Sequence, residues 1–254
     1  MNKLLFDQQT EIIKMSKGKL EKFAMIKEYE NCVEPTMEEV MKTGIDLKGQ
    51  WNKTFFKNNN PITVELACGG GEYTVGMAEM YPNRNFIGVD IKGNRIWKGA
   101  TKAIKKKLNN VGFLRTRIDF IANCFAKDEV DEIWITFPDP QINKNRRRKR
   151  LTNKLFLSRY QEFLKPDGKM RLKSDSDFFY EFTKEIIIEK NLEILFDCDD
   201  IYKKYIPQNP NSQLAKELSL KTFYENMWLE KGKTIKYIEY KLANLKIEKN
   251  EKLF

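Results

Sequence analysis

The 254-residue chain contains no histidine. This excludes Ser–His and Cys–His nucleophilic catalysis, histidine metal ligands and an imidazole general base. The four cysteines, at positions 32, 68, 124 and 198, are scattered and never form a Cys-x-x-Cys pair. A disulfide framework or a thiolate metal site is therefore poorly supported, and we expect no metal. Any chemistry has to use carboxylates, lysines, backbone groups or a reactive cofactor.

Long hydrophobic runs are also missing. No apolar stretch approaches the length needed to span a bilayer, and no signal-peptide pattern opens the chain. We therefore expect a cytoplasmic protein without a membrane segment.

Basic residues, by contrast, are abundant: 46 Lys and Arg against 36 Asp and Glu give a net charge of +10. Such an excess favours polyanionic partners.

The pattern of apolar segments predicts one α/β domain. Residues 1–50 are interpreted as a basic extension that orders partly on the domain or on a partner, and residues 51–254 as the domain itself. Strands are expected at 62–66, 85–89, 111–117, 132–137, 169–173, 192–196 and 235–242. Helices are expected at 73–80, 95–108, 120–125, 153–164, 178–190 and 222–230. This alternation predicts a doubly wound, mostly parallel, seven-stranded Rossmann-like sheet with helices on both faces.

A glycine cluster lies where the first of these strands turns into a helix. Gly69 and Gly71 allow a ligand close to the backbone, and Glu65 precedes them. Asp90 ends the next strand, where an acid can bind both ribose hydroxyls of a nucleotide-like cofactor. A nicotinamide dinucleotide usually requires G-x-G-x-x-G, which is missing. S-adenosylmethionine carries a sulfonium and an ammonium, and Glu65 is placed to face them. Without a ligand, the glycines would only make a tight turn, with Glu65 capping a helix.

The segment Ile135–Leu151 (ITFPDPQINKNRRRKRL) is the strongest functional signal. Its apolar strand ends in Pro138-Asp139-Pro140, and in a doubly wound sheet the functional crevice lies at the carboxyl ends of the strands. Asp139 is therefore a candidate catalytic carboxylate, held by restricted backbone on both sides. The basic run that follows suits RNA phosphates, because guanidinium groups bind phosphate in a bidentate manner. Its candidate contacts to the RNA backbone are Arg146, Arg147, Arg148, Lys149 and Arg150. Alternatively, the run is a solvated loop or a nuclear-localisation signal.

Four ordered motifs make the chain closely similar to bacterial tRNA (guanine-N7)-methyltransferases. These are the turn Glu65–Gly71, the strand end Phe137–Pro140 with its basic loop, Ser174-Asp175, and Thr222-Phe223-Tyr224-Glu225. The resemblance covers residues 47–242. It implies a Rossmann-like methyltransferase fold and transfer of a methyl group from S-adenosylmethionine to N7 of a guanine in tRNA, usually at position 46.

The resemblance also implies roles for individual residues. Asp139 matches the acid regarded as catalytic and also belongs to the cofactor set. The cofactor contacts are expected at Glu65, Gly69, Gly71, Asp90 and Asp119, with Asn123 as the alternative to Asp119 for the adenine. The substrate contacts are expected at Asn143 or Lys144, Asp175, Thr222, Phe223, Tyr224 and Glu225.

The chain departs from the family pattern at four positions. Ala67 replaces the first glycine of the turn, Gln141 a tryptophan and Ser174 a threonine. Asn143 occupies the usual lysine slot, with Lys144 one place later, so either can take that role.

Purely structural roles also remain open for individual residues. Asp175 and Glu225 could be a loop cap and a helix-surface acid, and Thr222 a simple N-cap. The aromatic rings of Phe178, Phe179, Phe223 and Tyr224 are expected in the core rather than under a base.

Three rival functions are weaker. A methyltransferase for exocyclic amines would have Asp/Asn-Pro-Pro-aromatic. A non-catalytic RNA-binding protein on the same scaffold would not require Glu65 together with Asp90, and a nicotinamide oxidoreductase lacks its glycine spacing. The oligomeric state, monomer or otherwise, stays open.

Overall fold

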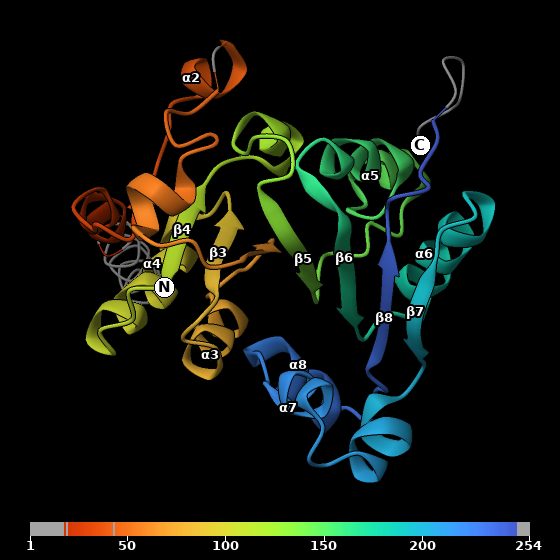
Figure 1. The fold of residues 1–254 in the computed structure, drawn as a ribbon. Helices are drawn as coiled ribbons and strands as arrows, with labels where there is room; N and C mark the ends of the chain where they lie inside the picture. Colours follow the sequence, from red (N-terminus) through yellow and green to blue (C-terminus); the bar gives the residue numbers. More distant parts are fainter. Residues whose placement is uncertain (1–17, 19, 43, 248–254) are drawn as a thin grey trace, which may run out of the picture.

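An eight-stranded, mostly parallel sheet forms the centre of the protein (Figure 1). The structure is a computed structural model that describes residues 18, 20–42 and 44–247. The strand order is β1-β4-β3-β2-β5-β6-β8-β7, and only β8 runs antiparallel to its neighbours β6 and β7. The strands are β1 (Cys32–Val33), β2 (Ile62–Leu66), β3 (Asn85–Asp90), β4 (Val111–Arg115), β5 (Val130–Thr136), β6 (Leu164–Ser174), β7 (Ile194–Cys198) and β8 (Lys236–Lys241).

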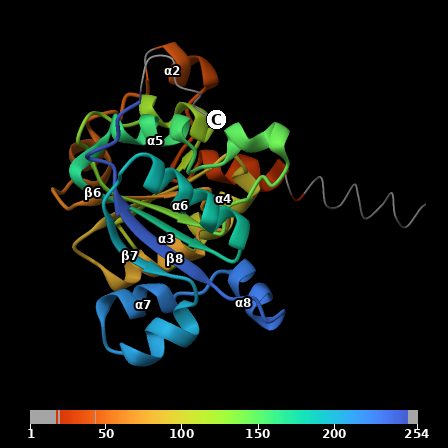
Figure 2. The same cartoon turned by 90° about the vertical axis from the view of Figure 1, so that its right-hand side faces the viewer.

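Helices follow the strands in the alternation that the sequence predicts. They are α2 (Met37–Lys42), α3 (Glu72–Met80), α4 (Gly93–Lys105), α5 (Lys154–Gln161), α6 (Asp177–Glu189), α7 (Gln213–Ser219) and α8 (Phe223–Glu230). Shorter helical turns are η1 (Trp51–Phe56), η2 (Ile118–Asn123), η3 (Lys144–Lys149), η4 (Ile201–Tyr205) and η5 (Ile206–Gln208). The helix α7 lies in a segment for which no helix was expected. Figures 1 and 2 both show α7 and α8 at one end of the molecule and α2 at the other.

The expected doubly wound fold is confirmed, with one strand more than expected. The additional strand is β1, which pairs in parallel with β4 through Cys32 opposite Phe113. It was missed because two residues are too short for any periodic pattern to show. Residues 1–17, 19 and 43 of the expected extension lie outside the described residues. The described remainder also adds the buried side chains of Ile26, Val40 and Ile45 to the core.

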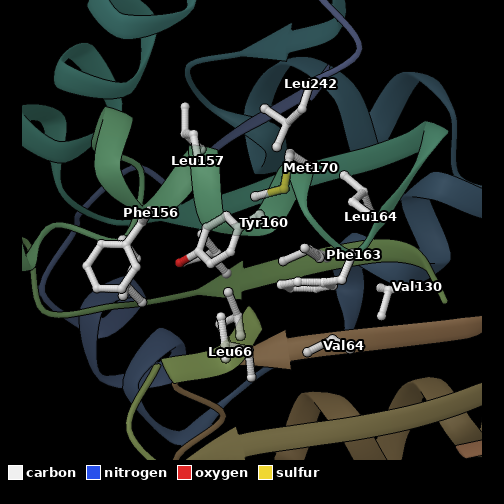
Figure 3. Close-up of a cluster of buried hydrophobic side chains, with 14 of the residues drawn as sticks. Val64, Leu66, Val130, Phe156, Leu157, Tyr160, Phe163, Leu164, Met170 and Leu242 are labelled. Carbon is white, nitrogen blue, oxygen red and sulfur yellow. The ribbon is translucent and has the colours of Figure 1, made fainter. Parts of the chain in front are cut away.

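Two apolar layers cover the two faces of the sheet, because successive side chains of a strand point to opposite faces. On one face, Phe156, Leu157 and Tyr160 of α5 lie over Val64 and Leu66 of β2 (Figure 3). The other layer joins α3, α4 and α7 to the sheet through residues such as Tyr73, Ile96, Phe113, Trp134 and Leu218. Burial of each such large side chain contributes about 1.5–3 kcal/mol to stability.

The strand order places a topological switch point at β2. The chain leaves β2 toward β3 and β4 on one side, and later returns to β5 on the other side of β2. The helices after β2 and β5 therefore diverge and open a crevice at the carboxyl ends of these strands. The glycine turn follows β2, and Asp139 follows β5, so both sequence signals meet at this crevice.

Candidate active site

The turn after β2 has three residues in the left-handed backbone region. They are Ala67, with φ +57°, Gly69, with φ +58°, and Gly71, with φ +70°. A Cβ on Gly71 would lie 2.7 Å from the Phe113 ring, so this position requires glycine. A Cβ on Gly69 would meet nothing within 4 Å. Ala67 adopts the left-handed conformation although it is not glycine, and the turn keeps its shape at some cost in strain.

Asp90, at the end of β3, is tied to this turn. Its carboxylate accepts hydrogen bonds from the backbone N–H of Gly69 at 3.0 Å and of Lys92 at 2.8 Å. These bonds fix the orientation of the carboxylate beside the glycines. Each carboxylate oxygen has a further lone pair, so Asp90 can still accept hydroxyl donors from a ligand.

Glu65 lies beneath the turn rather than on the cavity wall. Its carboxylate is buried and accepts hydrogen bonds from the backbone N–H of Thr74 at 2.8 Å and from the hydroxyls of Thr74 and Thr136. Burial raises the pKa of Glu65 to about 7, against the opposing effect of these hydrogen bonds. Glu65 is therefore linked to the site indirectly, by its hydrogen bond with Thr136.

Thr136, the last residue of β5, was not singled out from the sequence. Its hydroxyl has one hydrogen, which it donates to Glu65. Thr136 also lines the cavity, and only its oxygen lone pairs remain to face a ligand. It is therefore an acceptor, suited to an ammonium or another donor group.

The segment after β5 is shaped by two more non-glycine residues with positive φ, Phe137 at +47° and Gln141 at +48°. Asp139 lies between them and accepts a hydrogen bond from the Gln141 N–H at 3.0 Å through one carboxylate oxygen. The second carboxylate oxygen makes no hydrogen bond within the described part of the chain. The prolines and this bond hold Asp139 at the rim of the crevice.

These pieces enclose one cavity of about 320 Å³ at the switch point. Its wall combines the glycine turn, the end of β3, the start of α4, the segment after β5 and the start of α8. The lining residues are Ala67, Cys68, Gly69, Gly70, Glu72, Asp90, Lys92, Arg95, Lys98, Thr136, Phe137, Pro138, Asp139, Thr222, Phe223 and Tyr224. Sequence reasoning missed Glu72, Lys92, Arg95, Lys98 and Thr136. The positions of Lys92 and Arg95, two and five residues after Asp90, could have indicated that they lie near the site.

The start of α8 is held over the cavity by a buried ion pair. The ammonium of Lys173 on β6 lies 2.7 Å from the carboxylate of Glu225, and both side chains are fully buried. The same ammonium donates to the backbone carbonyls of Leu218 at 2.7 Å and Leu220 at 3.0 Å. Burial lowers the pKa of Lys173 to about 8, and the carboxylate of Glu225 opposes this shift.

This arrangement corrects the expectations for α8. Glu225 is fully buried and closes a capping box with Thr222, so it supports the site and does not face the cavity. A buried carboxylate needs a cation, and Lys173 supplies it. Phe223 and Tyr224, expected in the core, are instead 66% and 42% exposed at the cavity mouth.

The basic run forms the exposed helical turn η3, with one exception. Arg150 is buried and donates to the backbone carbonyls of Gln141 at 3.1 Å and Ile142 at 3.3 Å. Its guanidinium also lies 4.5 Å and 4.6 Å from the ring centroids of Phe178 and Phe182. The prediction of an RNA contact is therefore wrong for Arg150, which fastens the loop to α6. Arg146, Arg147, Arg148 and Lys149 remain exposed.

Several predicted contacts lie outside the cavity wall. The side chain of Asp119 is half-buried and pairs with Arg117 at 3.3 Å, and Asn123 donates to the Val40 carbonyl at 2.9 Å. Neither acceptor candidate for the adenine therefore lines the cavity. Asn143 caps η3 by accepting a hydrogen bond from the Asn145 N–H at 2.9 Å. The adjacent Lys144 side chain is exposed. Asp175 pairs with Lys233 at 3.2 Å.

Within residues 18, 20–42 and 44–247, no group of three Cys, Asp or Glu side chains is arranged to hold a metal ion. No helix in the same part of the chain is long and apolar enough to cross a membrane.

Comparison with known proteins agrees with this geometry. A family described as "Putative methyltransferase" matches residues 59–238. A tRNA (guanine-N(7)-)-methyltransferase of Christiangramia forsetii is 48% identical over 228 residues, which cover 89% of this chain and 99% of that protein. The enzyme of the same name from Bacteroides thetaiotaomicron is 47% identical, over 90% of this chain and 87% of that protein.

Solved structures agree at the level of the fold. The crystal structure of the 16S rRNA methyltransferase KamB superposes with a TM-score of 0.55 at 12% identity, covering 74% of this chain and 91% of that one. Fold and site together define a Rossmann-like methyltransferase. Within that class, the chain belongs to the tRNA (guanine-N(7)-)-methyltransferase family.

Proposed function

We propose that this protein transfers the methyl group of S-adenosylmethionine to N7 of a guanine in tRNA, at position 46 of the variable region. The observation that carries the proposal is that one cavity joins the glycine turn, Asp90 and Asp139. Lys144, the first residue of the exposed basic turn η3, follows Asp139 by only five positions. The names of the relatives support the same substrate.

The residues of the cavity fit S-adenosylmethionine. Open space at Gly69 admits a ligand against the backbone, and Asp90 is oriented to accept two ribose hydroxyls. Thr136 offers only lone pairs to the cavity, and its hydrogen bond connects it to the Glu65 carboxylate. This pair suits the cationic end of the cofactor, where the methyl donor is a sulfonium.

Guanine N7 carries a lone pair, so its methylation needs no deprotonation. The absence of histidine is therefore compatible with the reaction. The main task of the protein is to align the two reactants. The rigid turn after β2 and the segment Phe137–Gln141 provide fixed walls for that alignment.

Methyl transfer moves positive charge from sulfur to the purine ring. Asp139 lies on the cavity wall with one carboxylate oxygen unused by the described residues. A carboxylate near the purine stabilises the developing charge. We assign this role to Asp139.

The substrate contacts follow from what faces the cavity. Thr222, Phe223 and Tyr224 line it at the start of α8, and the exposed ring of Phe223 presents a face on which a base can stack. The exposed η3 residues would then bind tRNA phosphates. As an enzyme of tRNA, the protein would act in the cytoplasm.

Incubation of the purified protein with labelled S-adenosylmethionine and bulk tRNA, followed by nucleoside analysis, tests the proposal. We expect the label in 7-methylguanosine only, and the label in any other nucleoside would overturn the stated specificity. Calorimetry without tRNA adds an independent readout. If S-adenosylmethionine does not bind, the protein is an RNA-binding member without catalysis.

A further inference from the structure

A second basic surface runs along α4, away from the basic turn η3. Lys92, Arg95, Lys98, Lys102 and Lys105 follow one another at intervals of three or four residues. This spacing places them on one side of a helix, along about 20 Å. Arg95 is half-buried and the other four residues are exposed. We call these five residues the α4 basic stripe.

The charges of the stripe are not used to hold the fold together. None of its five residues forms an ion pair with any described residue, and α4 itself contains no Asp or Glu. Among the described residues, the Arg95 side chain makes one hydrogen bond, to the hydroxyl of Tyr224 at 3.4 Å. The next residue, Lys106, differs because it pairs with Glu79 at 2.8 Å. Five cations on one helix face without ion pairs to described residues repel one another, so ion pairing within the fold does not explain them.

Helix stability accounts for only two of the five residues of the stripe. Lys102 and Lys105 lie in the last turn of α4, where cations are favoured by the helix dipole. Lys92 and Arg95 lie at the N-terminal end, where cations are disfavoured. These two residues and Lys98 line the cavity. The two cations that the helix dipole disfavours are thus located at the cavity, where a ligand would bind.

The strand order puts the stripe and the turn η3 on opposite sides of β2. The stripe begins right after β3, and η3 follows β5, while β2 lies between these strands. Neighbouring strands are about 4.8 Å apart, so the carboxyl ends of β3 and β5, from which the two basic segments lead away, lie roughly 10 Å from each other. A nucleotide that enters the cavity has phosphates on both its 5′ and 3′ sides. One basic segment is available for each side.

We propose that the α4 basic stripe binds the tRNA backbone on the side of the cavity opposite η3. The target nucleotide is then held through phosphates on both flanks. The inference rests on the proposed function and adds a second contact surface to it. The carboxylate of the cofactor presents the same anionic chemistry to Arg95 and Lys98. Lys102 and Lys105, however, lie outside the cavity wall and can contact only an extended anion.

The test uses the full-length protein and compares two double variants. Lys102→Gln/Lys105→Gln removes the outer half of the stripe. Lys53→Gln/Lys127→Gln is the matched control, because it also removes two exposed lysines without ion pairs to described residues. Lys53 lies in η1, before β2, and Lys127 lies in the turn before β5, and neither residue lines the cavity. Binding of tRNA is measured by filter binding over a series of KCl concentrations, and binding of S-adenosylmethionine by calorimetry.

We expect the stripe variant to bind tRNA about fivefold to tenfold more weakly near 0.1 M KCl, with a salt slope that is smaller by about 1.5–2. Its affinity for S-adenosylmethionine should equal that of the wild type, and the control should retain both affinities. Unchanged tRNA binding and salt slope in the stripe variant would overturn the proposal.

A third variant, Lys98→Gln, examines the inner half. Weaker tRNA binding with normal cofactor binding supports the proposal for Lys98, and loss of cofactor affinity alone overturns it for Lys98.

Methylation by the wild type distinguishes failure of the stripe proposal from failure of the proposed function. If the wild type methylates guanine N7 in tRNA and the stripe variant binds normally, only the stripe proposal fails. If the wild type transfers no methyl group to tRNA, the proposed function itself fails.

Discussion

The ammonium of Lys173 lies 2.7 Å from the carboxylate of Glu225, and neither side chain has any exposed surface. Lys173 belongs to β6 in the centre of the sheet, whereas Glu225 belongs to the first turn of α8. The pair therefore connects the rigid sheet with the segment that carries Thr222, Phe223 and Tyr224 to the cavity. A conformational constraint on the site is built into the core.

Removal of one partner of this pair should be strongly destabilising. We expect Lys173→Met and Glu225→Gln each to lower the free energy of unfolding by about 3–5 kcal/mol, because each leaves a buried group without its partner. The double variant should lose much less than the sum of the two. Urea unfolding of the four proteins gives the coupling energy. Strictly additive losses would show that the two charges act independently.

Glu65 should make stability depend on pH. Its pKa is about 7 in the folded protein, against about 4.3 in an unfolded chain. The folded state thus holds a proton that the unfolded state has lost, and this contribution is complete below about pH 4.5 and disappears as the pH rises through 7. We expect Glu65→Gln to gain about 2–3 kcal/mol relative to the wild type between pH 5 and pH 8. Parallel stability curves in urea would mean that Glu65 is ionised throughout.

Asp139→Asn should reduce kcat about 10²–10³-fold while tRNA binding changes little, since the carboxylate acts on charge that develops during transfer. Asp167→Asn is the control, because Asp167 is an exposed residue near the start of β6 and does not line the cavity. Single-turnover methylation and filter binding separate the two effects. A normal kcat with weakened tRNA binding would make Asp139 a positioning group only.

Phe223→Ala should weaken tRNA binding without loss of stability, because the ring is 66% exposed. Stacking of one base contributes about 1–3 kcal/mol, so KM for tRNA should rise by fivefold or more. Phe223→Tyr keeps an aromatic face and should restore most of the affinity. If the alanine variant has a normal KM, no base stacks at this position.

Arg150 and Arg146 should behave differently although they are four residues apart. Arg150→Lys removes two backbone hydrogen bonds and a stacked planar group, and lysine does not replace either well. We expect it to lower the melting temperature by several degrees. Arg146→Lys should leave the melting temperature unchanged, because that side chain is exposed. Equal melting temperatures for both variants would contradict the structural role of Arg150.

The sequence predicted the sheet well because most strands are short apolar runs with clear punctuation. It missed β1, where two residues show no period, and α7, whose polar surroundings hid the short apolar stretch that includes the buried Ala215 and Leu218. Asp90 and Asp139 were correctly expected at the crevice, and both line the cavity, because strand ends are predictable positions; their roles stay predictions. Glu225 and Arg150 were misjudged, since a sequence does not reveal whether a charged residue turns inward. Their partners, Lys173 and the Phe178–Phe182 ring pair, come from distant elements.

The left-handed conformation of Ala67, Phe137 and Gln141 has a thermodynamic consequence for ligand binding. These residues bracket the cavity at the ends of β2 and β5, and such strained φ values persist only where the surrounding structure holds the backbone firmly. The walls are thus ordered before any ligand arrives, so binding loses little conformational entropy. Amide hydrogen exchange at Cys68, Gly69, Gly71, Phe137 and Gln141, whose N–H groups are hydrogen-bonded, should already be slow in the apoprotein, and the cofactor should slow it only slightly.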